Sequence, residues 1–158
     1  MTQIIKVSEI LSQFINDIKG EIPKVKVYGV IGNHSSAFAN KKERSNKENF
    51  ERLIFEFIKL RTNTKVITNG VEDYVMYKIG DREILATHGN RDSVANIKQH
   101  FVDLLGRTFD EYHIGHYHHF EVKEDCGSEI ICNSSFVATD DFSVSIRKNS
   151  RPSQALRI

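Results

Sequence analysis

The sequence predicts a mixed α/β fold, in which helices alternate with strands first and short strands dominate later. Apolar residues recur at helical spacing over 7–18, 50–58 and 94–105, and β-branched or alternating runs lie between these segments. No internal repeat, low-complexity segment or linker interrupts this order. The 158 residues therefore predict one layered domain, residues 1–158, with a single core.

Three segments are predicted to be helices. The first covers about 7–18 and ends before Pro23, which cannot continue a helix. The second covers about 46–61, and the third is capped by Ser93 and closed by Gly106. The apolar stripe predicted for the first helix consists of Val7, Ile10, Leu11, Phe14 and Ile18.

The predicted strands are short and are separated by turn residues. A strand is expected at 24–31, before an exposed polar loop over 35–46, and Gly80-Asp81 predicts a hairpin turn. The other predicted strands cover 65–68, 73–79, 83–88, 111–114, 117–123, 129–133 and 154–158.

Composition indicates an ordinary soluble globular protein. Hydrophobic residues make up 39% and charged residues 27%, and a net charge of +1 gives no global field that would attract nucleic acid or an anionic membrane. No run of about 18 apolar residues predicts a membrane span, and the first ten residues lack the build of a signal peptide. A cytoplasmic location is expected. Cys126 and Cys132 are read as reduced thiols, with a hairpin disulfide as the alternative.

Three stretches combine glycine with side chains that can bind metal. They read GNH at 32–34, HGN at 88–90 and GHYH at 115–118, and each follows a predicted apolar strand. Imidazole nitrogens and an amide oxygen suit Mn²⁺, Zn²⁺ and Fe²⁺. Strand ends fix the directions of such side chains on a rigid scaffold, so their tips can converge on one cleft.

Each stretch also has a reading without a metal. Asn33 and His34 alone are typical of turn chemistry, and His88 alone is typical of a core histidine bonded to a backbone carbonyl. His116 and His118 alternate and would share one face of a strand, which a solvated strand also produces. The three stretches together and in this order favour a metal site.

This ordered set resembles the calcineurin-like metallophosphoesterases, whose motifs are D-x-H, G-D-x-x-D, G-N-H, a later H near glycine, and G-H-x-H. The last three match 32–34, 88–89 and 115–118, and the resemblance covers nearly the whole chain. Phage-encoded members described as DNA-repair exonucleases are similar in two stretches. These stretches read GNHSSAFANKKERSNKENFERL and NSSFVATDDFSVSIRKNSRPSQALRI.

The resemblance implies a metal-dependent phosphoester hydrolase of phosphodiesterase or nuclease type, which uses a two-metal mechanism on DNA or a nucleotide. Asn33, His88 and His116 would hold one metal ion, and His118 would belong to the other. His34 would lie beside the leaving-group oxygen, as general acid or as a positive charge. Manganese is the expected metal, with zinc, iron and nickel as alternatives.

The first two motifs of that family are missing. No D-x-H occurs in the sequence, and Gly80-Asp81 lacks the second acid and follows the GNH stretch. We therefore expect a carboxy-terminal part of such an enzyme: an incomplete αββα sandwich lacking its amino-terminal strands, with an incomplete second metal site. An open sheet edge or exposed apolar face should result, covered by a complementary amino-terminal polypeptide or a second copy.

The alternative is an inactive remnant that binds a partner or a single metal ion. The predicted helices argue against an unrelated cupin-like barrel, and Phe120 stands where a histidine-triad hydrolase needs a third histidine. His113 and His119 are read as non-ligands, and Asp140 and Asp141 as loop or cap residues. A solvated loop is favoured over a phosphate-binding patch for Lys41, Lys42, Arg44 and Lys47.

Overall fold

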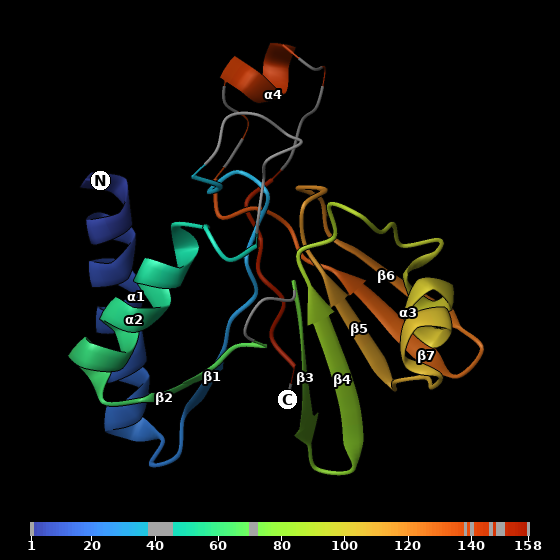
Figure 1. Ribbon diagram of the computed structural model, residues 1–158, viewed down its shortest axis with the longest axis horizontal. Helices are drawn as coiled ribbons and strands as arrows, with labels where there is room; N and C mark the ends of the chain where they lie inside the picture. Colours follow the sequence, from blue (N-terminus) through green and yellow to red (C-terminus); the bar gives the residue numbers. More distant parts are fainter. Residues whose placement is uncertain are drawn as a thin grey trace. The chain divides into compact units, whose positions relative to one another are not determined.

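The computed structural model describes residues 2–37, 46–69, 73–137, 139, 141–145, 147 and 151–157 (Figure 1). Lys41, Lys42, Arg44 and Asp140 lie outside these residues. The chain forms two compact units, Met1–Val75 and Met76–Ile158, and each is described by itself. Helices alternate with strands and a five-stranded sheet is present, so the predicted α/β class is confirmed.

The first unit contains two helices and two short strands. Helix α1 (Thr2–Glu21) lies beside α2 (Glu51–Thr62), and β1 (Lys26–Tyr28) pairs in parallel with β2 (Lys65–Ile67) (Figure 1). Within the described part of the chain, each of these strands pairs only with the other. The core of this unit consists of Ile15, Ile58 and Val66, with Leu11, Val25, Val27, Ile54 and Phe55 packed against it.

The buried face of α1 differs from the predicted stripe. Ser8, Ser12 and Ile15 are buried, and the Ser8 hydroxyl donates to the Ile4 carbonyl one turn earlier. Small side chains such as serine allow packed helices to approach closely. The residues that remain exposed are Val7, Ile10 and Phe14, at 42%, 67% and 60%.

The second unit contains a mixed five-stranded sheet in the order β3-β4-β5-β7-β6. Strands β4, β5 and β7 are parallel neighbours, and β6 is antiparallel to β7. Their bounds are β3 (Tyr74–Ile79), β4 (Arg82–Thr87), β5 (Glu111–Ile114), β6 (Glu121–Asp125) and β7 (Ser128–Cys132). The predicted hairpin turn is confirmed, because β3 and β4 are joined through Gly80 at φ +58°.

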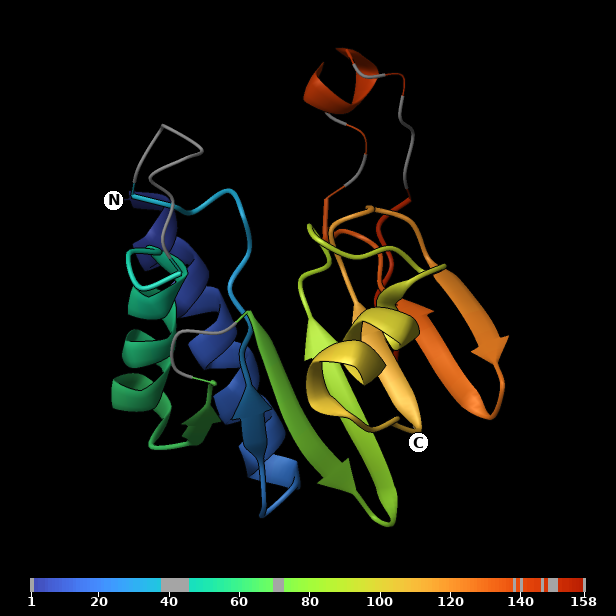
Figure 2. The same ribbon diagram turned by 45° about the vertical axis from the view of Figure 1, so that its right-hand side comes forward.

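Helix α3 (Ile97–Leu105) lies over one face of this sheet (Figure 2). Its Ile97 and Phe101 are buried. Across the sheet, the paired residues Leu85, Tyr112 and Ile130 are fully buried as well. This apolar packing fixes the three parallel strands whose ends carry the candidate site.

Several predicted boundaries are wrong. The second helix begins at Glu51 rather than 46, because 46–50 form turns and a bridge between Ser36 and Asn49. The third begins at Ile97, because the Ser93 carbonyl closes a turn by accepting the amides of Asn96 and Ile97.

The last predicted strand, 154–158, is also wrong for its described residues, because none of 154–157 is in a strand. Side chains anchor the segment instead: the Ala155 amide donates to Asn133 and the Gln154 amide group to Ser134. A short helix that was not predicted, α4 (Asp141–Ser145), has Asp141 in its first turn. No helix in the described ranges has both the length and the apolar character that crossing a membrane requires.

Candidate functional site

Parallel register brings two of the predicted stretches together. Thr87 at the end of β4 is the partner of Ile114 at the end of β5, so His88 and Gly115 leave the sheet side by side. The Gly115 amide donates to the His88 carbonyl at 3.1 Å, which continues the ladder one step past both strands. The next strand, β7, ends at the same edge, where the Asn133 amide donates to the Ile114 carbonyl at 2.7 Å.

The imidazole rings of His88 and His116 meet at this edge. His116 Nδ1 lies 3.3 Å from His88 Nε2, and the ring planes cross at 75° with 5.1 Å between centroids. Both side chains are partly buried. This pair is the part of the predicted metal site that the second unit assembles.

The glycine at 89 permits this close approach of the two strand ends. Gly89 is buried at φ +96°, and a Cβ atom there would lie 2.3 Å from Ile114. A Cβ atom at Gly115 would lie 3.4 Å from the His88 carbonyl oxygen, which is an ordinary contact distance. Packing between adjacent strand ends therefore explains the glycine at position 89.

Tyr117 ties the GHYH loop to the loop that follows β4. Its hydroxyl donates to the Asp92 carbonyl, and its ring lies edge-to-face with His116 at 5.4 Å between centroids. Burial, followed by the nearby Asp92 charge, raises the pKa of Tyr117 above its ordinary value. The phenol therefore stays protonated and keeps its role as hydrogen-bond donor at neutral pH.

The GHYH stretch is not a strand, contrary to the sequence prediction for 117–123. Residues 116–119 form bends, and His116 and His118 adopt φ +65° and +59°. Left-handed backbone breaks the alternation expected of a strand, so the two side chains do not share a strand face. His118 is exposed, and its carbonyl accepts the Ser134 hydroxyl at 3.2 Å.

In the first unit, the GNH stretch forms a loop against the start of α2. The Gly32 amide donates to Glu51 Oε2 at 2.5 Å, and Asn49 Nδ2 donates to the Gly32 carbonyl at 2.8 Å. Ser35 Oγ donates to the other oxygen of Glu51 at 2.7 Å. Asn33 is partly buried and His34 is exposed. Two side chains of α2 and its preceding turn thus fix the loop that carries the predicted ligand.

The histidines read as non-ligands make contacts with carboxylates. His113 Nε2 lies 2.8 Å from Glu111, and His113 Nδ1 lies 3.2 Å from the Tyr77 hydroxyl. His119 Nε2 lies 3.2 Å from Glu121. Glu111 is buried and also pairs with Arg82 at 2.9 Å and with Arg157 at 3.2 Å.

The separation within the histidine pair fits two ligands of one ion. Zinc–nitrogen bonds of about 2.0–2.1 Å in a tetrahedron place neighbouring ligand nitrogens about 3.3 Å apart. A hydrogen bond joins His116 Nδ1 and His88 Nε2, and its length of 3.3 Å matches that edge. No group of three or more His, Cys, Asp or Glu side chains arranged for a metal occurs among the described residues.

Sequence reasoning missed the residues that support the loops. Glu51, Asn49 and Asp92 act through backbone amides and carbonyls, and no motif marks such contacts. Tyr117 lay inside the GHYH stretch, and its aromatic ring between two histidines was the available signal.

Comparison with known proteins gives structural likeness alone. No protein-family model and no curated protein matches the chain. A Vps29 mutant from Entamoeba histolytica is 16% identical with a TM-score of 0.47, covering 91% of this chain and 72% of that one. An archaeal phosphodiesterase is 18% identical with a TM-score of 0.47, and the match covers 79% of this chain and 76% of that one. A predicted phosphoesterase from Streptococcus pneumoniae is 13% identical with a TM-score of 0.42, and the match covers 92% of this chain and 71% of that one. Likeness at this level assigns neither ligand nor activity.

Proposed function

We propose that this chain is part of a cytoplasmic, metal-dependent phosphoester hydrolase of the metallophosphoesterase kind, acting as a phosphodiesterase or nuclease on DNA or a nucleotide. The observation that carries the proposal is the His88–His116 pair, at 3.3 Å, where parallel strands β4 and β5 end. Its spacing suits two ligands of one divalent ion. The order of the GNH, HG and GHYH stretches supports the same assignment.

In this proposal the two compact units form one domain, and Asn33 joins His88 and His116 as the third ligand. Asn33 supplies an amide oxygen, and the Glu51 and Asn49 contacts to Gly32 hold the loop that presents it. A manganese ion would supply Lewis-acid activation of the phosphoester and of water. His34 is exposed and can donate a proton to a leaving-group oxygen. His118 is assigned to a second ion.

The second metal site needs ligands that these 158 residues do not contain. The sequence has no D-x-H and no complete G-D-x-x-D, so the carboxylates that would neutralise a metal pair come from another segment. Such a segment could cover Ile10 and Phe14, which are exposed on α1. It could also pair with the β1–β2 sheet, whose two outer edges are open among the described residues. We propose a complementary polypeptide, with a second copy of the chain as the alternative.

Metal binding is the first test. Titration calorimetry with Mn²⁺ and Zn²⁺ should show that His116→Gln weakens binding at least about tenfold, because a direct ligand is lost. His119→Gln is the matched control and should bind like the unaltered chain, because His119 pairs with Glu121 rather than with His88. Equal binding by both variants would contradict the assignment of His116.

Activity is the second test. Hydrolysis of bis(p-nitrophenyl) phosphate should be measured for this chain alone and mixed with a polypeptide, encoded next to it, that carries D-x-H and G-D-x-x-D. Activity only in the mixture is the expected result. An inactive mixture that still binds metal would favour the alternative function, a single-metal or partner-binding remnant. The specific observation in favour of that alternative is that two histidines, and no larger ligand group, meet among the described residues.

A further inference from the structure

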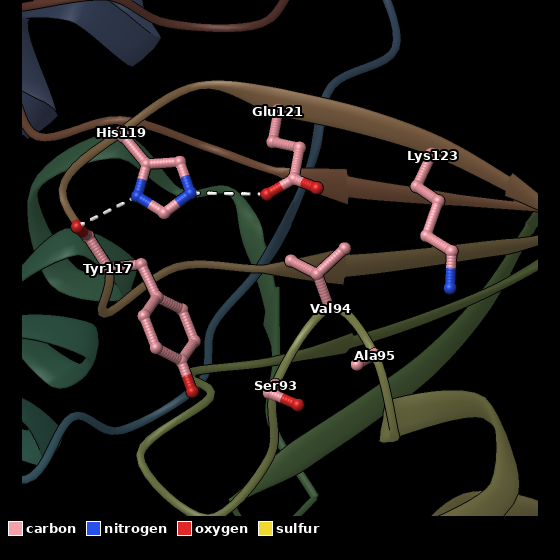
Figure 3. Close-up of a pocket in the computed structure, with 7 residues that line it drawn as sticks. All are labelled: Ser93, Val94, Ala95, Tyr117, His119, Glu121 and Lys123. Carbon is pink, nitrogen blue, oxygen red and sulfur yellow. Dashed lines mark hydrogen bonds and ion pairs between the residues drawn. The ribbon is translucent and has the colours of Figure 1, made fainter.

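The second unit contains a pocket of about 380 Å³. Its walls come from the loop before α3, which carries Ser93, Val94 and Ala95, and from β6 with the segment that precedes it (Figure 3). Figure 3 shows the Tyr117 ring at one end, the Lys123 side chain at the other, and Val94 between them. The volume is near the lower end of small-ligand pockets, about 300–1,000 Å³, and suits one compact ring system.

Tyr117 connects this pocket to the candidate metal site. Its ring lines the pocket and also lies edge-to-face with His116, 5.4 Å between centroids. The hydrogen bond from its hydroxyl to the Asp92 carbonyl fixes the ring in place. A phosphoester bound at His116 would therefore extend its next group over a rigid aromatic side chain.

The remaining lining combines apolar surface with hydrogen-bond donors and hydrogen-bond acceptors. Val94 and Ala95 offer apolar contacts, whereas the polar groups stand around them. Ser93 Oγ donates to Asn96 Oδ1 at 2.9 Å, which leaves its lone pairs as acceptors. Glu121 is a second acceptor and pairs with His119 at 3.2 Å, and the Lys123 ammonium is a donor.

We propose that this pocket binds the planar heteroaromatic group of a phosphoester substrate, that is, the nucleobase of a nucleotide. An aromatic face beside two small apolar side chains suits a flat ring, and donors with acceptors at the margin suit the edges of a base. A saturated sugar offers no flat ring to the aromatic face, and an alkyl group offers no partner to the polar groups at the margin. The assignment names the substrate class of the proposed function and rests on it.

Binding of adenosine to the metal-free protein tests the pocket by itself. In EDTA, adenosine should shift the amide resonances of Val94 and Ala95 in a saturable way, and ribose should not. Val94→Asp should weaken adenosine binding at least about tenfold, because a charged side chain replaces the apolar wall. No saturable shift with adenosine, or an equal shift with ribose, would overturn the inference.

Val122→Asp is the matched control for that variant. Val122 lies on β6 between the pocket residues Glu121 and Lys123 but is not part of the lining, and it is 49% exposed. The Val122→Asp protein should bind adenosine like the unaltered chain. Equal losses in the two valine variants would mean that added charge, rather than the pocket wall, weakens binding, and would overturn the inference.

A second measurement links the pocket to the histidine pair. Equilibrium dialysis should show that Mn²⁺ tightens binding of adenosine monophosphate about tenfold and leaves adenosine unchanged, because only the monophosphate reaches both sites. His116→Gln should abolish the Mn²⁺ effect and leave adenosine binding intact. Adenosine binding without any Mn²⁺ effect would overturn the substrate assignment. Failure of the proposed function would appear separately, as absent metal binding or hydrolysis in the tests above.

Discussion

The loop at 32–34 and the pair formed by His88 and His116 look alike in sequence but are held in different ways. In both, a glycine and the end of a predicted strand lie next to the side chain that is predicted to bind metal. The loop is fixed by side chains, because Glu51 and Asn49 bind the backbone of Gly32. The pair is fixed by backbone, because the register of β4 and β5 continues through Gly115 and His88. Removing one side chain should therefore destabilise the loop, whereas adding volume at a glycine should destabilise the pair.

The largest expected effect comes from volume at the pair. Gly89→Ala places a Cβ 2.3 Å from Ile114 at φ +96°, so it combines overpacking of about 1–3 kcal/mol with left-handed strain of about 1–2 kcal/mol. The free energy of unfolding should fall by about 3 kcal/mol in urea titration. Metal affinity of the pair should fall with it.

Gly127→Ala separates the two causes. Gly127 has φ +80° and nothing within 4 Å of its ideal Cβ, so this variant adds strain without a clash. A loss of about 1 kcal/mol is expected. If both alanine variants lost the same amount, close packing between the strand ends would not be what requires glycine at 89.

The next effect concerns the side-chain support of the loop. Glu51→Ala removes the acceptor for the Gly32 amide and the Ser35 hydroxyl, and bonds to a charged acceptor contribute about 1.5–3 kcal/mol. Urea unfolding should show a loss of about 2 kcal/mol. Glu56→Ala on the same helix removes only a surface contact to Lys59 and should cost less than about 0.5 kcal/mol. Similar losses would show that Glu51 contributes as a helix residue and not through the loop.

A pH dependence at the end of β7 is expected to be smaller than the effects of Gly89→Ala and Glu51→Ala. Burial, with a smaller contribution from the charge of Glu121, raises the pKa of Cys132 from 9.0 to about 11. The folded protein therefore keeps this proton at pH values where the unfolded chain has lost it. Stability is fully present below pH 9 and declines as the pH rises toward 11, by about 1.4 kcal/mol at pH 10.

Urea titrations at pH 7 and pH 10 measure this decline. Cys132→Ala should remove about 1.4 kcal/mol of the pH-dependent loss, whereas Cys126→Ala should leave it unchanged, because Cys126 is exposed. Identical pH dependence in both variants would show that Cys132 does not titrate as its burial requires. Both cysteines are free thiols, as the sequence analysis favoured.

The sequence determined the α/β class, most of the strands and the placement of glycines and histidines just past the strand ends. Periodicity and glycine placement are local properties, so β2, β3 and β5 were found within a residue or so. Helix α1 shows where such reasoning fails: Val7, Ile10 and Phe14 of its predicted apolar stripe are exposed, whereas Ser8 and Ser12 are buried.

Tertiary structure alone decided what the histidines meet. Spacing predicted that His116 and His118 alternate on a strand, whereas left-handed backbone at both residues turns the chain into bends. The contact between His88 and His116 joins residues 28 positions apart, and it exists because two parallel strands end in register. Sequence carries the donor atoms, but the register that sets the distance between them arises from packing across the sheet.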